Sequence, residues 1–168
     1  MSQMIEFDKD RNVATLGGAS MVLHCHFYNC TLQRAVEQGL GAAAHDVLRD
    51  AAVATVRGQL QKVAPPRAPR SEVLSIASRL FSELGFGRFA PFALDATGGE
   101  VIVTSSHYAM GWLSIYGDRS EPACRFVEGF LQAAVEAAFG KTSGVTVEEH
   151  RCFACGHDDC RFRVEVKP

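Results

Sequence analysis

The sequence predicts an α+β fold in which a mainly antiparallel sheet is packed by helices. Three observations support this prediction. Apolar residues recur at helical spacing in several segments. Apolar and polar residues alternate in two segments near the C-terminus, which is typical of strands with one buried face. A Thr97-Gly98-Gly99 sequence between two other strand-like segments predicts a hairpin turn, and hairpins join antiparallel strands.

The N-terminal region, residues 1–64, is predicted to be mostly helical. Residues 5–16 are expected to hold one short strand, which ends where two glycines follow. A helix is expected from Ser20, whose side chain suits an N-cap, to about Gln38. A second helix is expected over residues 42–63, because its apolar side chains recur at helical spacing.

A proline-rich connector, residues 65–70, separates this region from residues 71–168, although the whole chain is expected to form one compact unit. Further elements are predicted beyond the connector. In chain order they are a helix capped by Ser71 and ended by Gly85, strands over residues 88–94 and 101–104, a helix opened by Glu121-Pro122 and ended by Gly140, and strands over residues 145–149 and 161–166.

Composition and charge argue against several classes of protein. The 168 residues are 47% hydrophobic and 21% charged, which is ordinary for a globular protein. A net charge of −2 and the lack of a Lys/Arg run argue against a nucleic-acid partner. The sequence shows neither a membrane-length apolar run nor a secretory signal, so a cytoplasmic location and no membrane partner are expected. In a reducing compartment, the six cysteines favour metal or redox chemistry over disulfides.

The most informative stretch is residues 149–160, which hold a carboxylate, three thiols and two imidazoles. This loop lies between two predicted strands, so its ends are expected to lie close together. A further cysteine stands at the start of the last long helix, where it can approach the same loop. Thiolates and a carboxylate suit zinc, and four protein ligands make a closed, structural site. The expected ligands are Cys124, Glu149, Cys152 and Cys160.

Two other residues of the loop leave the ligand set open. If Cys155 takes the place of Glu149, four sulfur ligands result, and zinc or an iron–sulfur cluster would then fit equally well. His157 is a second candidate for the same place. A loop that binds no metal is the remaining alternative.

The pattern Glu149-x-x-Cys152-x-x-x-Gly156-x-x-x-Cys160, preceded by Cys124 and a long helix, resembles the 4-vinyl reductase domain. The resemblance covers about residues 70–166. It implies an α+β ligand-binding domain similar to the subunits of trafficking complexes. Such domains occur in bacteriochlorophyll biosynthesis proteins and as sensory domains of phenol- and xylene-responsive activators. In the aromatic-sensing members zinc is bound at matching positions, so the resemblance places those roles on Cys124, Glu149, Cys152 and Cys160. The chain shows no ATPase or DNA-binding part and is expected not to be such an activator itself.

A second cluster of potential ligands lies near the N-terminus, in His24-Cys25-His26-Phe-Tyr-Asn-Cys30. On a helix, His26 and Cys30 share one face, and such a pair can bind one edge of a metal ion. One hypothesis is therefore a second metal or cofactor site, such as haem or iron, with further ligands among His45, His107 and His150. The alternatives are buried packing residues and a reactive thiol.

An aromatic-rich stretch, residues 106–116, suggests a ligand pocket for a small hydrophobic, aromatic or tetrapyrrole-like molecule. Its candidate residues are His107, Tyr108 and Trp112. In the aromatic-sensing relatives a Trp and a His hold the phenolic hydroxyl, so the resemblance makes Trp112 and His107 the nearest candidates for that role. The alternative is that these side chains only build the core.

Two functions follow as hypotheses. The first is a hydrocarbon-binding module or ligand sensor with a structural zinc, and the absence of a catalytic constellation in the sequence favours it over an enzyme. The second is a redox or accessory enzyme that uses a cofactor held by the N-terminal His/Cys cluster. A third option is an assembly subunit without a ligand. A homodimer is expected in each case, with close-packing faces on the Ala-rich helices predicted over residues 42–63 and 126–139.

Overall fold

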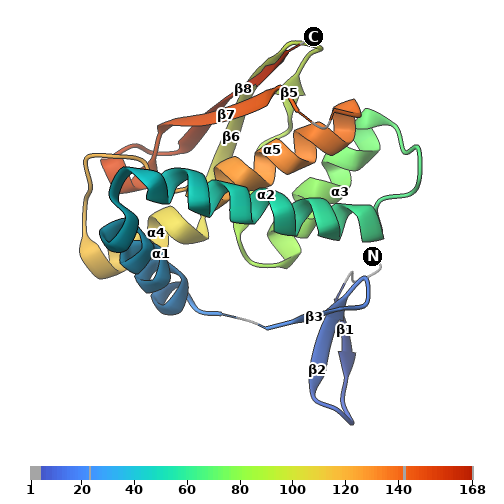
Figure 1. Cartoon of the computed structure of the whole chain (residues 1–168), viewed down its shortest axis with the longest axis horizontal. Coiled ribbons are helices and arrows are strands. Elements are labelled where there is room, and N and C mark those ends of the chain that lie inside the picture. Colours follow the sequence, from blue (N-terminus) through green and yellow to red (C-terminus); the bar gives the residue numbers. More distant parts are fainter. Residues whose placement is uncertain (1–4, 23, 142, 168) are drawn as a thin grey trace.

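The structure, a computed structural model, describes residues 5–22, 24–141 and 143–167. Figure 1 shows the arrangement of its elements. In chain order these are β1 (Ile5–Asp8), β2 (Val13–Leu16), β3 (Ala19–Met21), α1 (His26–Leu40), η1 (Gly41–Ala43), α2 (Ala44–Val63), α3 (Arg70–Glu83), β4 (Gly87–Phe89), β5 (Ala93–Leu94), β6 (Gly98–Ser106), α4 (His107–Tyr116), α5 (Arg125–Phe139), β7 (Val145–Arg151), η2 (Phe153–Cys155) and β8 (Cys160–Val166).

The main sheet has the strand order β4-β6-β8-β7, with β5 paired to β6, and every pairing is antiparallel. Its long strands alternate as a half-buried sheet must. Val101 of β6 stands opposite Phe162 of β8, Val147 of β7 stands opposite Val164, and all four side chains are buried. The predicted α+β class with a mainly antiparallel sheet is therefore confirmed.

Helix α5 lies between the sheet and α2: it packs against β7 on one side and along α2 on the other (Figure 1). Gly129 permits the close approach of the two helices, because a Cβ there would collide with the carbonyl oxygen of Arg49. The Ala-rich faces that were expected to support a dimer thus pack against each other within one chain. A homodimer stays a prediction, without that argument for it.

The N-terminal segment differs from its prediction. Residues 5–21 form a separate antiparallel sheet, β1-β2-β3, instead of one strand followed by a helix. Ser20 pairs with Thr15 in this sheet, so it cannot cap a helix, and α1 begins only at His26. Figure 1 shows the small sheet standing apart from the main sheet, with helices between them.

Three other boundaries move. Helix α3 begins at Arg70 with Pro69 as its N-cap, so Ser71 lies inside it. Helix α5 begins at Arg125, three residues after Pro122. Residues 107–116 form helix α4, which the sequence did not predict. The connector at residues 65–69 does not isolate the two regions, because α2 before it packs along α5 after it. Within the described residues no helix is long and apolar enough to span a bilayer.

Candidate metal centre and ligand pocket

Three elements bring the four predicted metal ligands together. Cys124 is the N-cap of α5, Glu149 occupies an inward-facing position of β7, Cys152 follows that strand, and Cys160 begins β8. All four side chains are buried, and one potential ligand atom from each lies within 4.8 Å of the others. In the described part of the chain this is the group of His, Cys, Asp and Glu side chains with the geometry to hold a metal ion.

Backbone N–H groups hold most of these side chains in place. The N–H of Cys124 donates to Oε2 of Glu149 at 2.8 Å. The N–H groups of Ala123 and Phe153 donate to Sγ of Cys152 and of Cys160, each at 3.4 Å. Oε1 of Glu149 is buried and has no hydrogen-bond partner among the described residues. A buried carboxylate oxygen without a partner is costly, and a cation in the group would satisfy it.

Electrostatics point the same way. Burial raises the pKa of Glu149 to about 9 and the pKa of Cys124 well above its ordinary value, and the neighbouring Cys152 raises the pKa of Glu149 further. By contrast, the pKa of Cys152 is lowered, because Cys124 and Cys160 stabilise its thiolate by hydrogen bonds. Without an ion, the four acidic groups therefore share little negative charge. A divalent cation offers the compensation that lets them ionise together, so the donor set fits zinc.

The two alternative ligands stand outside this group. Cys155 lies in the short η2 helix and is only half-buried. The Nδ1 atom of His157 lies 3.2 Å from the backbone nitrogen of Cys152, which donates to it. Both residues shape the loop around Cys152, while the carboxylate of Glu149 takes the fourth position in the group.

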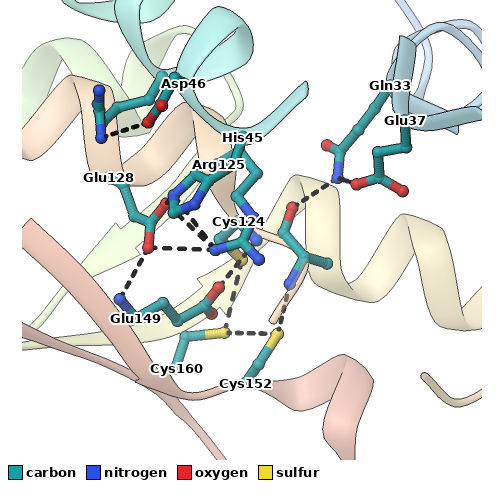
Figure 2. A network of polar contacts seen from close by, with 12 residues as sticks. Gln33, Glu37, His45, Asp46, Cys124, Arg125, Glu128, Glu149, Cys152 and Cys160 are labelled. Atoms are coloured by element: carbon teal, nitrogen blue, oxygen red, sulfur yellow. Dashed lines mark hydrogen bonds and ion pairs between the residues drawn. The ribbon is translucent and has the colours of Figure 1, made fainter. Parts of the chain in front are cut away.

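A second buried carboxylate supports the group from outside. Glu128 lies on α5 one turn after Cys124, and its side chain is 0% exposed. Its Oε1 accepts the N–H of Glu149 at 2.9 Å, and its Oε2 lies 2.7 Å from Nε2 of His45. Arg125 lies 3.4 Å from both oxygens. Figure 2 shows Glu128 between His45 and Arg125 on one side and Glu149 on the other. Sequence reasoning missed this residue, although an acidic side chain in an apolar helix stripe was a signal.

Helix α1 also reaches the group. Nε2 of Gln33 donates to the carbonyl oxygen of Ala123 and to Oε1 of Glu37, each at 2.9 Å (Figure 2). Since the N–H of Ala123 donates to Sγ of Cys152, Gln33 fixes the segment that carries two of the potential ligands. Both N-terminal helices thus contribute polar contacts to the surroundings of the C-terminal group.

The N-terminal His/Cys cluster is not gathered in this way. Cys25 is exposed and precedes α1, while Cys30 is fully buried, with Sγ 3.6 Å from the carbonyl oxygen of Tyr108. The ring of His24 contacts Tyr28, and the rings of His26 and His107 are 6.4 Å apart. Of the three further ligands considered, His45 pairs with Glu128 and His150 with Glu100, away from this segment.

A pocket of about 540 Å³ opens where the small N-terminal sheet meets the body of the protein. Apolar side chains from the sheet form one wall, and the end of α3, the start of α4 and Asn29 of α1 form the others. The lining residues are Ile5, Phe7, Ala14, Met21, Val22, His24, Asn29, Leu84, Gly85, Phe86, His107 and Tyr108. We call this the N-terminal pocket.

Two of the three predicted pocket residues line the N-terminal pocket. His107 presents its imidazole there, and its Nε2 lies 3.0 Å from Nδ2 of Asn29. An amide nitrogen only donates, so Nε2 accepts and the proton of a neutral ring sits on Nδ1. Burial, and then the charge of His26, lowers the pKa of His107, which keeps the ring neutral. Trp112 lies elsewhere, under the guanidinium of Arg119 and beside Tyr116.

With the geometry in place, the chain can be compared with known proteins. Residues 112–166 match the vinyl-4-reductase (V-4-R) domain family. The resemblance to the 4-vinyl reductase family is thereby confirmed for the C-terminal part of the chain. The matched segment contains all four residues of the metal group but begins after His107 and Tyr108. No curated protein matches the sequence well enough to add a relative.

Solved structures share the fold. The phenol-responsive sensory domain of the transcription activator PoxR, solved with phenol, has a TM-score of 0.84 at 20% identity, over 97% of this chain and 85% of that one. A vinyl-4-reductase family protein from Methanocaldococcus jannaschii has a TM-score of 0.51 at 16% identity, over 84% and 78%. A trafficking protein particle complex subunit 3 from Naegleria fowleri, covalently bound to palmitic acid, has a TM-score of 0.59 at 16% identity, over 85% and 95%. The expected similarity to trafficking subunits is confirmed as one of fold.

Proposed function

We propose that this protein binds and senses a small, mostly apolar molecule in the N-terminal pocket. The observation that carries the proposal is the pocket itself, whose volume of about 540 Å³ lies within the usual range for small-molecule sites. Apolar walls with a few polar groups favour a hydrophobic ligand held in one orientation. The same fold holds phenol in the PoxR sensory domain and palmitic acid in the trafficking subunit, which supports an apolar ligand.

The polar groups of the pocket narrow the chemistry of the ligand. His107 is a neutral imidazole next to the amide of Asn29, and burial raises the pKa of the Tyr108 phenol, so no fixed charge stands at this end. A charged ligand group would lose its hydration without gaining a partner. The proposed ligand is therefore an uncharged aromatic compound with a hydroxyl group that bonds to His107.

Cys124, Glu149, Cys152 and Cys160 would hold a structural zinc ion in this proposal. The ion would supply a crosslink between α5, β7 and β8. Since all four positions come from the protein, the site has no position open for a reacting molecule. A cytoplasmic location, a homodimer and the absence of nucleic-acid or membrane partners are parts of the proposal that derive from the sequence.

Ligand titration tests the proposal. Phenol, 1-naphthol and palmitic acid are titrated into ¹⁵N-labelled protein, and the side-chain amide of Asn29 and the imidazole of His107 are followed by NMR. The aromatic alcohols should bind saturably and shift both signals. His107→Ala should weaken their binding about tenfold, the effect of one hydrogen bond.

His150→Ala is the matched control, because this histidine lies exposed on the main sheet beside Glu100. It should bind all three compounds as the wild type does. The proposal fails if none of the three binds, or if the shifted signals lie away from the N-terminal pocket.

A further inference from the structure

One hydroxyl group connects the metal group to the N-terminal pocket. Ser106 ends β6 and is the N-cap of α4, where its Oγ accepts the N–H of Ala109 at 3.3 Å. The same Oγ lies 3.1 Å from Sγ of Cys124. The side chain is 0% exposed, so water does not compete for either contact. Sequence reasoning assigned no role to this serine.

The position of Ser106 determines how α4 enters the pocket. The first two residues of α4 are His107 and Tyr108, and both line the pocket. The backbone N–H of His107 also donates to the carbonyl oxygen of Phe86, another lining residue, at 2.9 Å. A displacement of the N-cap would therefore move the imidazole that faces the ligand.

The donors and acceptors at Ser106 are consistent with a link to a metal-bound cysteine. A serine hydroxyl has one hydrogen and two lone pairs. One lone pair accepts from Ala109, which leaves the hydrogen for Sγ of Cys124. A cysteine that binds a metal is a thiolate, which accepts this hydrogen bond strongly. Ligation and helix capping thus favour the same orientation of the hydroxyl.

We propose that Ser106 is a positioning residue that couples the metal group to the ligand pocket. The inference rests on the proposed function, because it assumes a metal at Cys124 and a ligand near His107. Fixing Cys124 fixes Ser106, and Ser106 fixes the first turn of α4. Coupling of this kind is reciprocal, so occupancy of the pocket also acts on the metal group.

The test replaces one metal by a larger one while the site stays loaded. The protein is prepared with Zn²⁺ and with Cd²⁺, and NMR compares the amide signal of Ala109 and the imidazole signals of His107. Both should shift between the two metals in the wild type. The amide of Phe153 serves as an internal reference, because it bonds directly to Sγ of Cys160 and should shift in every variant.

Three variants identify the residue responsible. In Ser106→Ala the shifts at Ala109 and His107 should be lost, while the shift at Phe153 remains. Ser105→Ala is the matched control: its hydroxyl contacts Sδ of Met110 instead of the metal group, and it should behave as the wild type. Ser106→Thr keeps a hydroxyl and should restore the shifts. Phenol affinity should fall about fivefold in Ser106→Ala, the size of a lost helix cap, and be unchanged in Ser105→Ala.

The outcomes separate this inference from the proposed function. If Phe153 shifts but Ala109 and His107 do not, or if Ser106→Ala retains their shifts, the coupling is refuted even though metal and ligand bind. If phenol, 1-naphthol and palmitic acid all fail to bind, the proposed function fails, and the metal-dependent shifts still decide whether Ser106 transmits a change from the metal group.

Discussion

The C-terminal and N-terminal His/Cys segments carry similar side chains at similar spacing, yet the structure uses them differently. Residues 149–160 reverse direction between β7 and β8, and their ligand atoms converge with that of Cys124. Residues 24–30 run into α1, where successive side chains point about 100° apart. One cysteine of that segment is exposed and the other is buried. Short spacing therefore predicts a site where the chain turns back on itself and not where it enters a helix.

The two regions also differ in the polar groups around them. Backbone N–H groups donate to Glu149, Cys152 and Cys160, and the carboxylate of Glu128 holds the backbone of Glu149. In the N-terminal segment Cys30 contacts only a carbonyl oxygen at 3.6 Å among the described residues, which is a weak interaction. Support for anionic ligands is thus built around one cluster, and the following predictions test that difference.

The largest effect is expected from Cys152→Ser. A serine hydroxyl is a poorer zinc ligand than a thiolate, and three remaining ligands cannot close the site. The variant should be isolated without zinc, whereas the wild type should hold one zinc ion per chain. It should lose about 4 kcal/mol of stability if free zinc exceeds the dissociation constant about 1,000-fold. Metal analysis of anaerobically purified protein and urea unfolding measure the two effects.

Cys25→Ser is the control for this prediction, because the thiol of Cys25 is exposed outside α1. Its zinc content and stability should equal those of the wild type. A Cys152→Ser protein that retains full stability without metal would show that the C-terminal group is packing and not a zinc site.

How far the sequence predicts the structure follows from the same contrast. The spacing of residues 149–160 between two alternating segments, with Cys124 before a helix, was enough to select the four side chains that converge. Strand alternation likewise identified β7 and β8. Both predictions rest on local signals that the tertiary structure leaves intact.

Other parts could not be predicted for physical reasons. Strands β1 to β3 have three or four residues each, too few for a period of two to be visible, so the sheet that walls the pocket was missed. Helix α4 was missed because its apolar and aromatic side chains are spread around it and show no clear stripe. Glu128 acts through partners on α2 and β7, which are distant in sequence.

The second prediction concerns Glu128→Gln. The amide keeps the shape of the side chain but removes its charge and one acceptor oxygen, so it cannot bond to His45, Arg125 and the N–H of Glu149 as the carboxylate does. Residues that orient metal ligands typically affect metal affinity about 10- to 100-fold. Zinc affinity, measured by competition with a chromophoric chelator, should fall by that factor.

Glu136→Gln is a matched control, since Glu136 is also a buried carboxylate on α5. It pairs with Arg57 of α2 at 2.6 Å, two turns beyond Glu128 and away from the metal group. It should lower stability without changing zinc affinity. Equal loss of affinity in the two variants would mean that Glu128 acts only through the packing of α2 on α5.

The smallest effect is expected in the N-terminal segment. The double variant His26→Ala/Cys30→Ala should keep one zinc ion per chain and an unchanged absorption spectrum, because neither side chain reaches the C-terminal group. Cys30 is buried against α4, and its truncation should cost about 1 kcal/mol, measured by urea unfolding. A wild-type protein with a second metal, or with a visible band that this variant loses, would overturn the contrast. The redox hypothesis would then apply to the N-terminal cluster, and the C-terminal zinc would serve only to hold the fold that presents it.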